Sequence, residues 1–249
     1  MRRLVDALLL AAVAVVAAAA VVDALEPDPV DPLERARDDL RRADVRGTLL
    51  VAEDDCTRRS LVLPALREQP RGVVGCSVYG RPGSLGILRG AVVWYAFPGG
   101  VTTLLRPAQL DAYVGRRARV TAVAWLGNVR YAVTYRVAGR PEETLAVFER
   151  GSLVRVLGRD QSFQGLRSSP RTRFLAARST RGLALWDALG DRVELPADAE
   201  GARALAWSPD ERWAVAASER ELTFFRLGAS TVTARIPLGA VDVDWERAG

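Results

Sequence analysis

A repeat with a period close to 40 residues runs through the C-terminal half of the chain and constrains its fold more than any other feature. RFLAARST at 173–180 is followed 39 positions later by RWAVAASE at 212–219, and Ser169-Pro170 precedes Ser208-Pro209 by the same 39 positions. Each unit consists of short apolar runs separated by Gly, Pro, Asp and Arg, without a sustained 3.6-residue period. This pattern predicts many short strands and few helices.

Strand alternation divides most of the chain into four similar units. They cover residues 76–110, 119–158, 162–198 and 203–238. A period near 40 with four strands in each unit is typical of a β-propeller, in which every unit is one blade. We therefore predict an all-β propeller domain over residues 47–249.

The two ends of this region complement each other. Residues 47–66 supply only two clear strands, so the innermost strand of a blade is missing there. VDVDW at 241–245 repeats the alternation of ALAW at 204–207 and begins a blade that then stops. We expect VDVDW to pair with the N-terminal strands and to close a ring of five four-stranded blades. Four complete units with an uncompleted remnant are the alternative.

The repeat resembles those of WD-repeat and TolB-like propellers. The residues that carry the resemblance are Ala206-Trp207-Ser208-Pro209-Asp210 and the strands WAVAAS and ELTFFRL that follow. It extends over about 43–249 and is clearest in the last two full units. The chain departs from the family at Glu211, where a Gly is usual after Ser-Pro-Asp, and in having Trp186-Asp187 as its one Trp-Asp pair. The resemblance implies a propeller and no particular subfamily.

Large aromatic residues recur at strand positions that repeat with the blade. They are Trp94, Trp125, Trp186, Trp207, Trp213, Phe225 and Trp245. Aromatic side chains bury a large apolar area, and this repetition favours packing between blades over a stacking platform for sugars or bases. We expect all seven in the core.

The chain begins with an apolar segment. Arg2 and Arg3 precede an uninterrupted apolar run from Ala7 to Val22. Residues 1–25 are therefore predicted to be a transmembrane signal anchor, or alternatively a signal peptide cleaved near Val22-Asp23-Ala24. Because the basic residues come first, the C-terminal domain is expected outside the cytoplasm. The predicted location is the cell membrane with a single span; secretion after cleavage is the alternative.

Residues 26–46 connect this segment to the propeller. EPDPVDP at 26–32 is a stiff, acidic, proline-rich spacer. Asp31 is suited to cap a helix with Pro32 at its first position, and this short charged helix should end before Gly47. We expect it to be a stalk rather than part of the core.

Export would place the two cysteines, Cys56 and Cys76, in a compartment that permits disulfides. We expect them to be bridged. A loop of this length stabilises a fold by roughly 3 kcal/mol in the chain-entropy model. Two buried free thiols are the alternative.

The chain contains no His, which excludes Ser-His-Asp and Cys-His sites and any His-ligated zinc or haem. Two cysteines cannot build a four-thiolate metal site alone. The glycine-rich loops G-x-G-x-x-G and G-x-x-x-x-G-K-[ST] that cradle phosphates are also missing. We predict no cofactor and no metal.

Two carboxylates lie on the last predicted strand. Asp242 and Asp244 occupy the small-residue positions that Ala204 and Ala206 fill one unit earlier, and they should lie roughly 7 Å apart on one side of the strand. The pair resembles the acidic arrangement of five-bladed glycan hydrolases, which implies an acid and a nucleophile or base. The structural interpretation, which we favour, is protection of a terminal strand from mispairing, or pairing with neighbouring Arg.

The formal charge of +5 comes from 35 arginines against 30 acidic residues. The arginines are scattered, which makes nucleic acid an unexpected partner. Only RRARV at 116–120 and Arg58-Arg59 form small basic clusters. Binding of an anionic polymer by these clusters is a third functional hypothesis.

These features together predict an exported, membrane-anchored propeller that acts as a non-catalytic binding or protein-interaction scaffold, with function carried by its loops. A protein or a cell-envelope polymer is the expected partner. A glycan-active hydrolase that uses Asp242 and Asp244 is the alternative.

Overall fold

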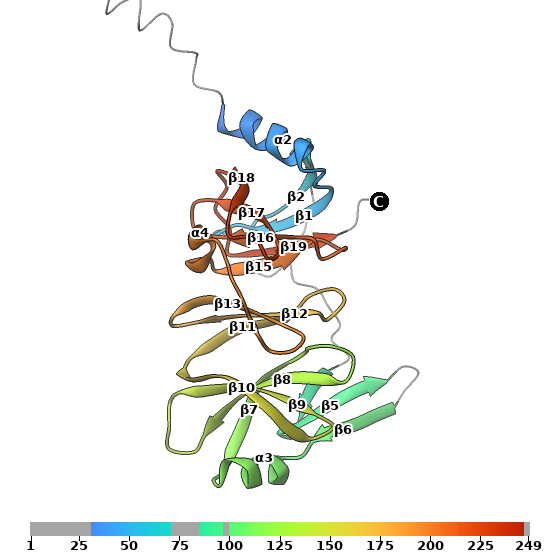
Figure 1. Cartoon of the computed structure of the whole chain (residues 1–249), viewed down its shortest axis with the longest axis vertical. Helices are drawn as coiled ribbons and strands as arrows, with labels where there is room; N and C mark the ends of the chain where they lie inside the picture. Colours follow the sequence, from blue (N-terminus) through green and yellow to red (C-terminus); the bar gives the residue numbers. More distant parts are fainter. Residues whose placement is uncertain (1–30, 71–84, 97–99, 247–249) are drawn as a thin grey trace, which may run out of the picture.

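A computed structural model of the chain describes residues 31–70, 85–96 and 100–246, which form antiparallel sheets stacked face to face (Figure 1). The first sheet has the order β19-β1-β2-β3 and the second the order β4-β5-β6. Their bounds are β1 (Gly47–Ala52), β2 (Arg58–Leu63), β3 (Arg67–Pro70), β19 (Asp242–Glu246), β4 (Leu85–Leu88), β5 (Ala91–Ala96) and β6 (Gly100–Leu105).

Three further sheets follow in chain order, each with four consecutive strands. The third comprises β7 (Ala118–Trp125), β8 (Arg130–Val137), β9 (Glu143–Glu149) and β10 (Ser152–Gln161). The fourth comprises β11 (Phe163–Ser168), β12 (Phe174–Ser179), β13 (Gly182–Asp187) and β14 (Arg192–Val193). The fifth comprises β15 (Ala204–Trp207), β16 (Trp213–Ala217), β17 (Leu222–Arg226) and β18 (Val232–Ile236). The helices are α2 (Pro32–Arg42), α3 (Pro107–Val114) and α4 (Ala197–Glu200).

The predicted units at 119–158, 162–198 and 203–238 are confirmed as the third, fourth and fifth sheets. The unit at 76–110 contains the second sheet, whose three described strands span 85–105; the innermost strand expected at 76–80 lies outside the described residues. Meanders of this kind, in chain order and packed face to face, are blades of the propeller type.

Apolar cores fill the spaces between consecutive sheets. One core joins the second sheet to the third, and others join the third to the fourth, the fourth to the fifth, and the fifth to the first. Between the second and third sheets the core includes Val92, Leu105 and Tyr131, and burial raises the pKa of the Tyr131 hydroxyl to about 12. The stack in Figure 1 runs from α3 at one end to α2 at the other.

The expected pairing of VDVDW with the N-terminal strands is confirmed. β19 lies antiparallel to β1, with Asp244 opposite Leu50 and Asp242 opposite Ala52. Val243 and Trp245 are buried in the core shared with the fifth sheet. The first sheet is therefore built from both ends of the propeller region.

Contact of the first sheet with the second, which would complete a ring, stays a prediction. The chain passes between these two sheets through residues 71–84, outside the described residues. Within the described ranges, no apolar core cluster contains residues of both sheets.

Helix α2 begins as predicted, because the Asp31 carboxylate accepts a hydrogen bond from the Leu33 N–H at 3.1 Å and Pro32 follows the cap. The expectation that it is a stalk is wrong. Ala36 and Leu40, one helical turn apart, are buried in the core of the first and fifth sheets together with Val45. Its many charges occupy the remaining faces, so a narrow apolar stripe is enough to dock the helix.

The repeated Ser-Pro pairs are turn devices. The hydroxyl oxygens of Ser169 and Ser208 each accept a hydrogen bond, from the N–H of Phe174 and of Trp213 respectively, at 3.0 Å. Both serines are buried. A side chain that satisfies a backbone donor in a tight turn explains why Ser recurs at this point of the repeat.

Glu211 stands where the family has Gly, and its backbone has the conformation that Gly favours, with φ of +59°. Such a conformation costs a non-glycine residue about 1–2 kcal/mol. The buried Glu211 carboxylate offsets part of this cost, because it accepts a hydrogen bond from the Arg171 N–H and lies 3.3 Å from Arg173 Nε. Both arginines belong to the β11–β12 turn, so Glu211 ties the fifth sheet to the fourth.

Most of the predicted core aromatics are buried. Trp186, Trp207, Phe225 and Trp245 are confirmed in the cores between sheets, and Trp125 and Trp213 are partly buried against them. The prediction for Trp94 is wrong, since its side chain is 39% exposed. The second sheet packs on β7 through Val92 near the start of β5, whereas Trp94 lies toward the far end of that strand.

The predicted N-terminal anchor or signal helix, residues 1–25, lies outside the described residues. Among the described residues, no helix has the length and apolar character needed to cross a membrane.

Removal of residues 240–249 should abolish cooperative unfolding. The deletion leaves β1 without its neighbour and uncovers the apolar side chains that Val243 and Trp245 contact. Thermal unfolding of the truncated and intact chains, followed by circular dichroism, measures this effect. Removal of residues 247–249 alone, which follow β19, is the control and should leave the melting temperature unchanged. An unaltered transition in the longer deletion would contradict the closure by β19.

Candidate functional site

The two candidate carboxylates lie on β19, at the edge of the first sheet. Val243 and Trp245 alternate with them and point into the core shared with the fifth sheet. Asp242 and Asp244 therefore share the opposite side of the strand. Their exposure differs, because Asp242 is buried and Asp244 is half-buried.

Asp242 forms an ion pair with Arg167 of β11, in the fourth sheet. The Arg167 side chain is 12% exposed and that of Asp242 is 5% exposed. The same guanidinium donates hydrogen bonds through Nη1 to the carbonyl oxygens of Val243, at 3.0 Å, and of Leu205, at 3.5 Å. One side chain thus connects the fourth sheet to the fifth and to the first.

A β-bulge sets the direction of Arg167. Gln164 lies opposite Arg178 and Arg167 lies opposite Ala176, so β11 has one more residue than β12 between these pairs. Gly165 occupies the bulge with φ of +61°, a conformation that glycine adopts without a steric penalty. Bulges re-aim the side chains that follow them, and here the side chain is directed along the edges of β15 and β19.

The ion pair between Arg167 and Asp242 is buried, so each charge needs the other to offset its loss of contact with water. Withdrawing either charge from water is costly unless the opposite charge and further hydrogen bonds are present. Asp242 Oδ1 also accepts a hydrogen bond from the Val243 N–H at 2.9 Å, and Arg167 binds two backbone carbonyls. Loss of one partner would leave the other charge buried and uncompensated.

This geometry favours a structural part for Asp242. A glycan hydrolase needs an acid and a nucleophile or base that both reach the substrate. Asp242 is instead enclosed with its counterion, while the carboxylate of Asp244 accepts a hydrogen bond from the Trp245 N–H at 2.9 Å. For Asp242, the ion pair with Arg167 agrees with one of the two structural interpretations favoured from the sequence, pairing with a neighbouring Arg.

Sequence reasoning missed Arg167. The signal was present, because superposing Ser169-Pro170 on Ser208-Pro209 places Arg167 where Ala206 stands in the next unit. Asp244 occupies the same place in the last unit. Small residues occupy this inner-strand position in two units and oppositely charged residues occupy it in two others, which marks Arg167 as a candidate partner for the carboxylates of the last strand.

The other predicted site residues are placed as follows. The described residues include no free cysteine, and Cys76 lies outside them, so the Cys56–Cys76 bridge stays a prediction. Arg59 of the Arg58-Arg59 cluster is ion-paired with Glu53, and its Nη1 lies 3.4 Å from Glu68 Oε1. Across the described ranges, no group of three or more His, Cys, Asp or Glu is placed to hold a metal.

Comparisons with known proteins find no matching family model and no matching curated relative. Solved structures with similar arrangements include the β-propeller domain of Cps50 (Swd1) from Myceliophteria thermophila, at 12% identity over 80% of this chain and 74% of that chain, with a TM-score of 0.38. The C-terminal WD40 domain of Sif2 gives 14% identity over 76% and 45%, with a TM-score of 0.38.

A third similar structure is regucalcin, a calcium-binding protein from Agrobacterium tumefaciens, at 12% identity over 78% of this chain and 71% of that chain, with a TM-score of 0.37. Scores at this level carry no argument about function. The description of this chain as propeller-type blades rests on its own sheets and their packing.

Replacing Arg167 by Met should destabilise the chain by about 3–5 kcal/mol, because it leaves the Asp242 carboxylate buried without its counterion. Chemical denaturation of the variant and the parent measures the difference. In the double variant R167M/D242L both charges are absent, so it should be more stable than R167M alone.

The matched control is R235Q, which breaks the ion pair of Arg235 with Asp198 on the surface, where the side chains are 52% and 48% exposed. It should cost at most about 1 kcal/mol. An R167M variant as stable as R235Q would show that the buried pair does not hold the sheets together.

Proposed function

We propose that this protein is an exported, membrane-anchored propeller of five blades, closed by β19, that acts as a non-catalytic binding scaffold outside the cytoplasm. The observation that carries the proposal is the buried pair of Arg167 and Asp242. In this pair Asp242, one of the two candidate catalytic carboxylates, instead helps to hold three sheets together. Function then falls to the turns and cavities at the ends of the sheets.

The proposed location rests on the sequence of the N-terminus. Arg2 and Arg3 before the apolar run from Ala7 to Val22 favour a span whose C-terminal side lies outside the cytoplasm. The docking of α2 on the first and fifth sheets supports a short connection. Residues 26–31 alone would then separate the span from the folded domain, which holds the propeller close to the membrane.

The full-length chain with a C-terminal tag should sediment with membranes and remain there after an alkaline carbonate wash. Protease added outside intact cells, after any outer envelope layer has been opened, should remove the tag, because the C-terminal domain lies outside the cytoplasm. A tag that is protected until the cells are lysed would contradict export. Recovery of the chain from the medium without residues 1–25 would support export and overturn the anchor.

A scaffold should bind a component of the cell envelope without converting it. We expect the full-length chain, cross-linked in whole cells and purified in detergent, to carry one envelope protein or polymer in a reproducible ratio. Envelope glycans incubated with the purified chain should release no reducing ends above background. Release of reducing ends that D242N and D244N both abolish would overturn the scaffold in favour of a hydrolase.

A further inference from the structure

A cavity of about 780 Å³ lies at the end of the stack away from α2 and is rich in arginine. Four arginines line it: Arg117 just before β7, Arg119 near the start of β7, Arg136 near the end of β8, and Arg140 in the β8–β9 turn. We call it the arginine cavity. Its other lining residues include Ile87, Gly90 and Thr121, and no acidic residue is among the described residues that line it. It contains most of the RRARV cluster that the sequence singled out.

The strand register places like charges together in this cavity. Arg119 lies directly opposite Arg136 on the neighbouring antiparallel strand. Like charges at such positions destabilise a sheet. Arg136 is compensated by the buried Glu143, at 3.2 Å, whereas Arg117, Arg119 and Arg140 have no carboxylate partner among the described residues. A cluster that costs stability and lacks internal counterions is suited to bind an external anion.

A second arginine-lined cavity, of about 660 Å³, lies beside the turn between α2 and β1 and differs in its charge balance. We call it the α2 cavity. Two of its arginines have acidic neighbours in its own wall: Arg46 Nε is 2.7 Å from Asp44, and Arg212 Nε is 3.6 Å from Asp210.

Asp210, in the wall of the α2 cavity, stays charged. Burial alone would raise the pKa of Asp210, but hydrogen bonds from the Ser208 hydroxyl and the Arg212 N–H, with the Arg212 charge, lower it below its ordinary value. The α2 cavity thus carries its own anions, while the described residues that line the arginine cavity include none.

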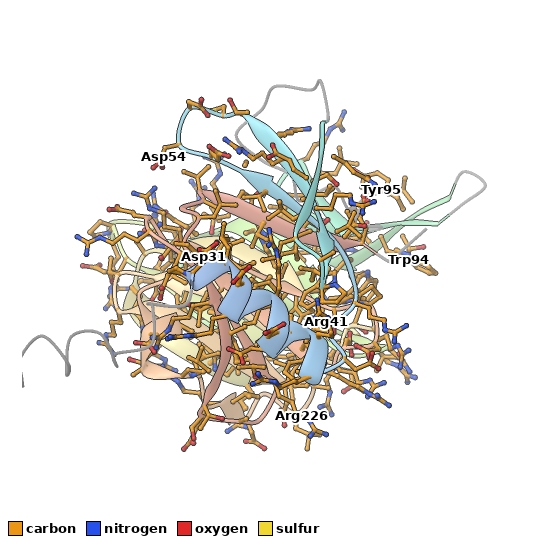
Figure 2. All side chains as sticks on the ribbon, turned by 90° about the horizontal axis from the view of Figure 1, so that it is seen from above. Asp31, Arg41, Asp54, Trp94, Tyr95 and Arg226 are labelled. Carbon is orange, nitrogen blue, oxygen red and sulfur yellow. The ribbon has the colours of Figure 1, made fainter. Side chains whose placement is uncertain are left out.

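Exposed apolar side chains lie on the second sheet, and one of them, Ile87, lines the arginine cavity. Ile87 is 40% exposed, and Trp94, 39% exposed, lies on the same side of the second sheet, because Trp94 pairs with Leu85 two residues before Ile87. Figure 2 shows Trp94 at the side of the molecule, clear of α2. The exposed Ile87 side chain, in a wall that also holds guanidinium groups, offers an apolar contact beside the charges.

We propose that the arginine cavity binds a segment of an acidic polysaccharide, a ligand class that rests on the scaffold function proposed above. Arg117 and Arg119 contact carboxylates of successive sugars. They are two residues apart, which is roughly 7 Å along an extended chain. Ile87 lies against the apolar face of a sugar ring. The charge complementarity and the place of the domain outside the cytoplasm favour this polymer over nucleic acid.

The test uses the full-length chain in a neutral detergent, immobilised and exposed to polygalacturonate, to uncharged dextran of similar length, and to single-stranded DNA. At low ionic strength the chain should bind polygalacturonate and not dextran, and the affinity should fall as salt is added. The double variant R117Q/R119Q should lower the affinity for polygalacturonate by about tenfold or more. Its melting temperature should be equal to or above that of the parent, because the repulsion between Arg119 and Arg136 is removed.

The matched control is R212Q/R226Q, which removes the same charge from the α2 cavity and should change the affinity less than about twofold. Equal losses in the two double variants would overturn the proposal, since they would mean that net charge alone attracts the polymer. DNA bound as tightly as polygalacturonate would overturn the assignment to polysaccharide. If polygalacturonate does not bind but an envelope component still co-purifies with the chain, this ligand assignment fails while the scaffold stands.

Discussion

The pairing of β19 with β1 is the constraint on which the rest of the described structure depends. It brings the last strand of the chain into the sheet formed by the first strands. That sheet then has the width to cover the fifth sheet, and α2 docks beside β18 on the core that these two sheets share. A single core, to which Trp245, Phe224 and Leu40 all belong, therefore joins segments from both ends of the described chain.

Polar contacts across the stack converge on the fourth sheet and the turn after its first strand. Three acidic residues are buried among the described ranges, and each has a partner there. Glu143 accepts a hydrogen bond from the Phe163 N–H at 3.0 Å, Glu211 accepts one from the Arg171 N–H, and Asp242 pairs with Arg167. Apolar cores hold neighbouring sheets face to face, and these contacts specify how the sheets are placed along each other.

Periodicity was sufficient to predict the blades because each blade repeats the same alternation of apolar residues, as in ALAW at 204–207 and VDVDW at 241–245. It could not place α2, which docks through two apolar residues, Ala36 and Leu40, among many charges. It also could not predict the exposure of Trp94, because the burial of that side chain depends on how far the neighbouring sheet extends. The candidate site was predictable only in part. Asp242 and Asp244 were visible as exceptions to the repeat, whereas the partner of Asp242 depends on a bulge at Gly165 that places Arg167 beside another sheet.

The long separation in sequence between β1 and β19 has a consequence for the order of folding. The second to fifth sheets each consist of segments close in sequence and can form as soon as they are synthesised. The first sheet cannot, because β1 at Gly47–Ala52 must wait for β19 at Asp242–Glu246. At typical synthesis rates this delay is roughly 10–40 s, during which β1 has an unpaired edge and α2 lacks its docking surface. The sheet that begins with β1 is thus completed after the other four, so β1 must be kept from aggregating until β19 has been synthesised.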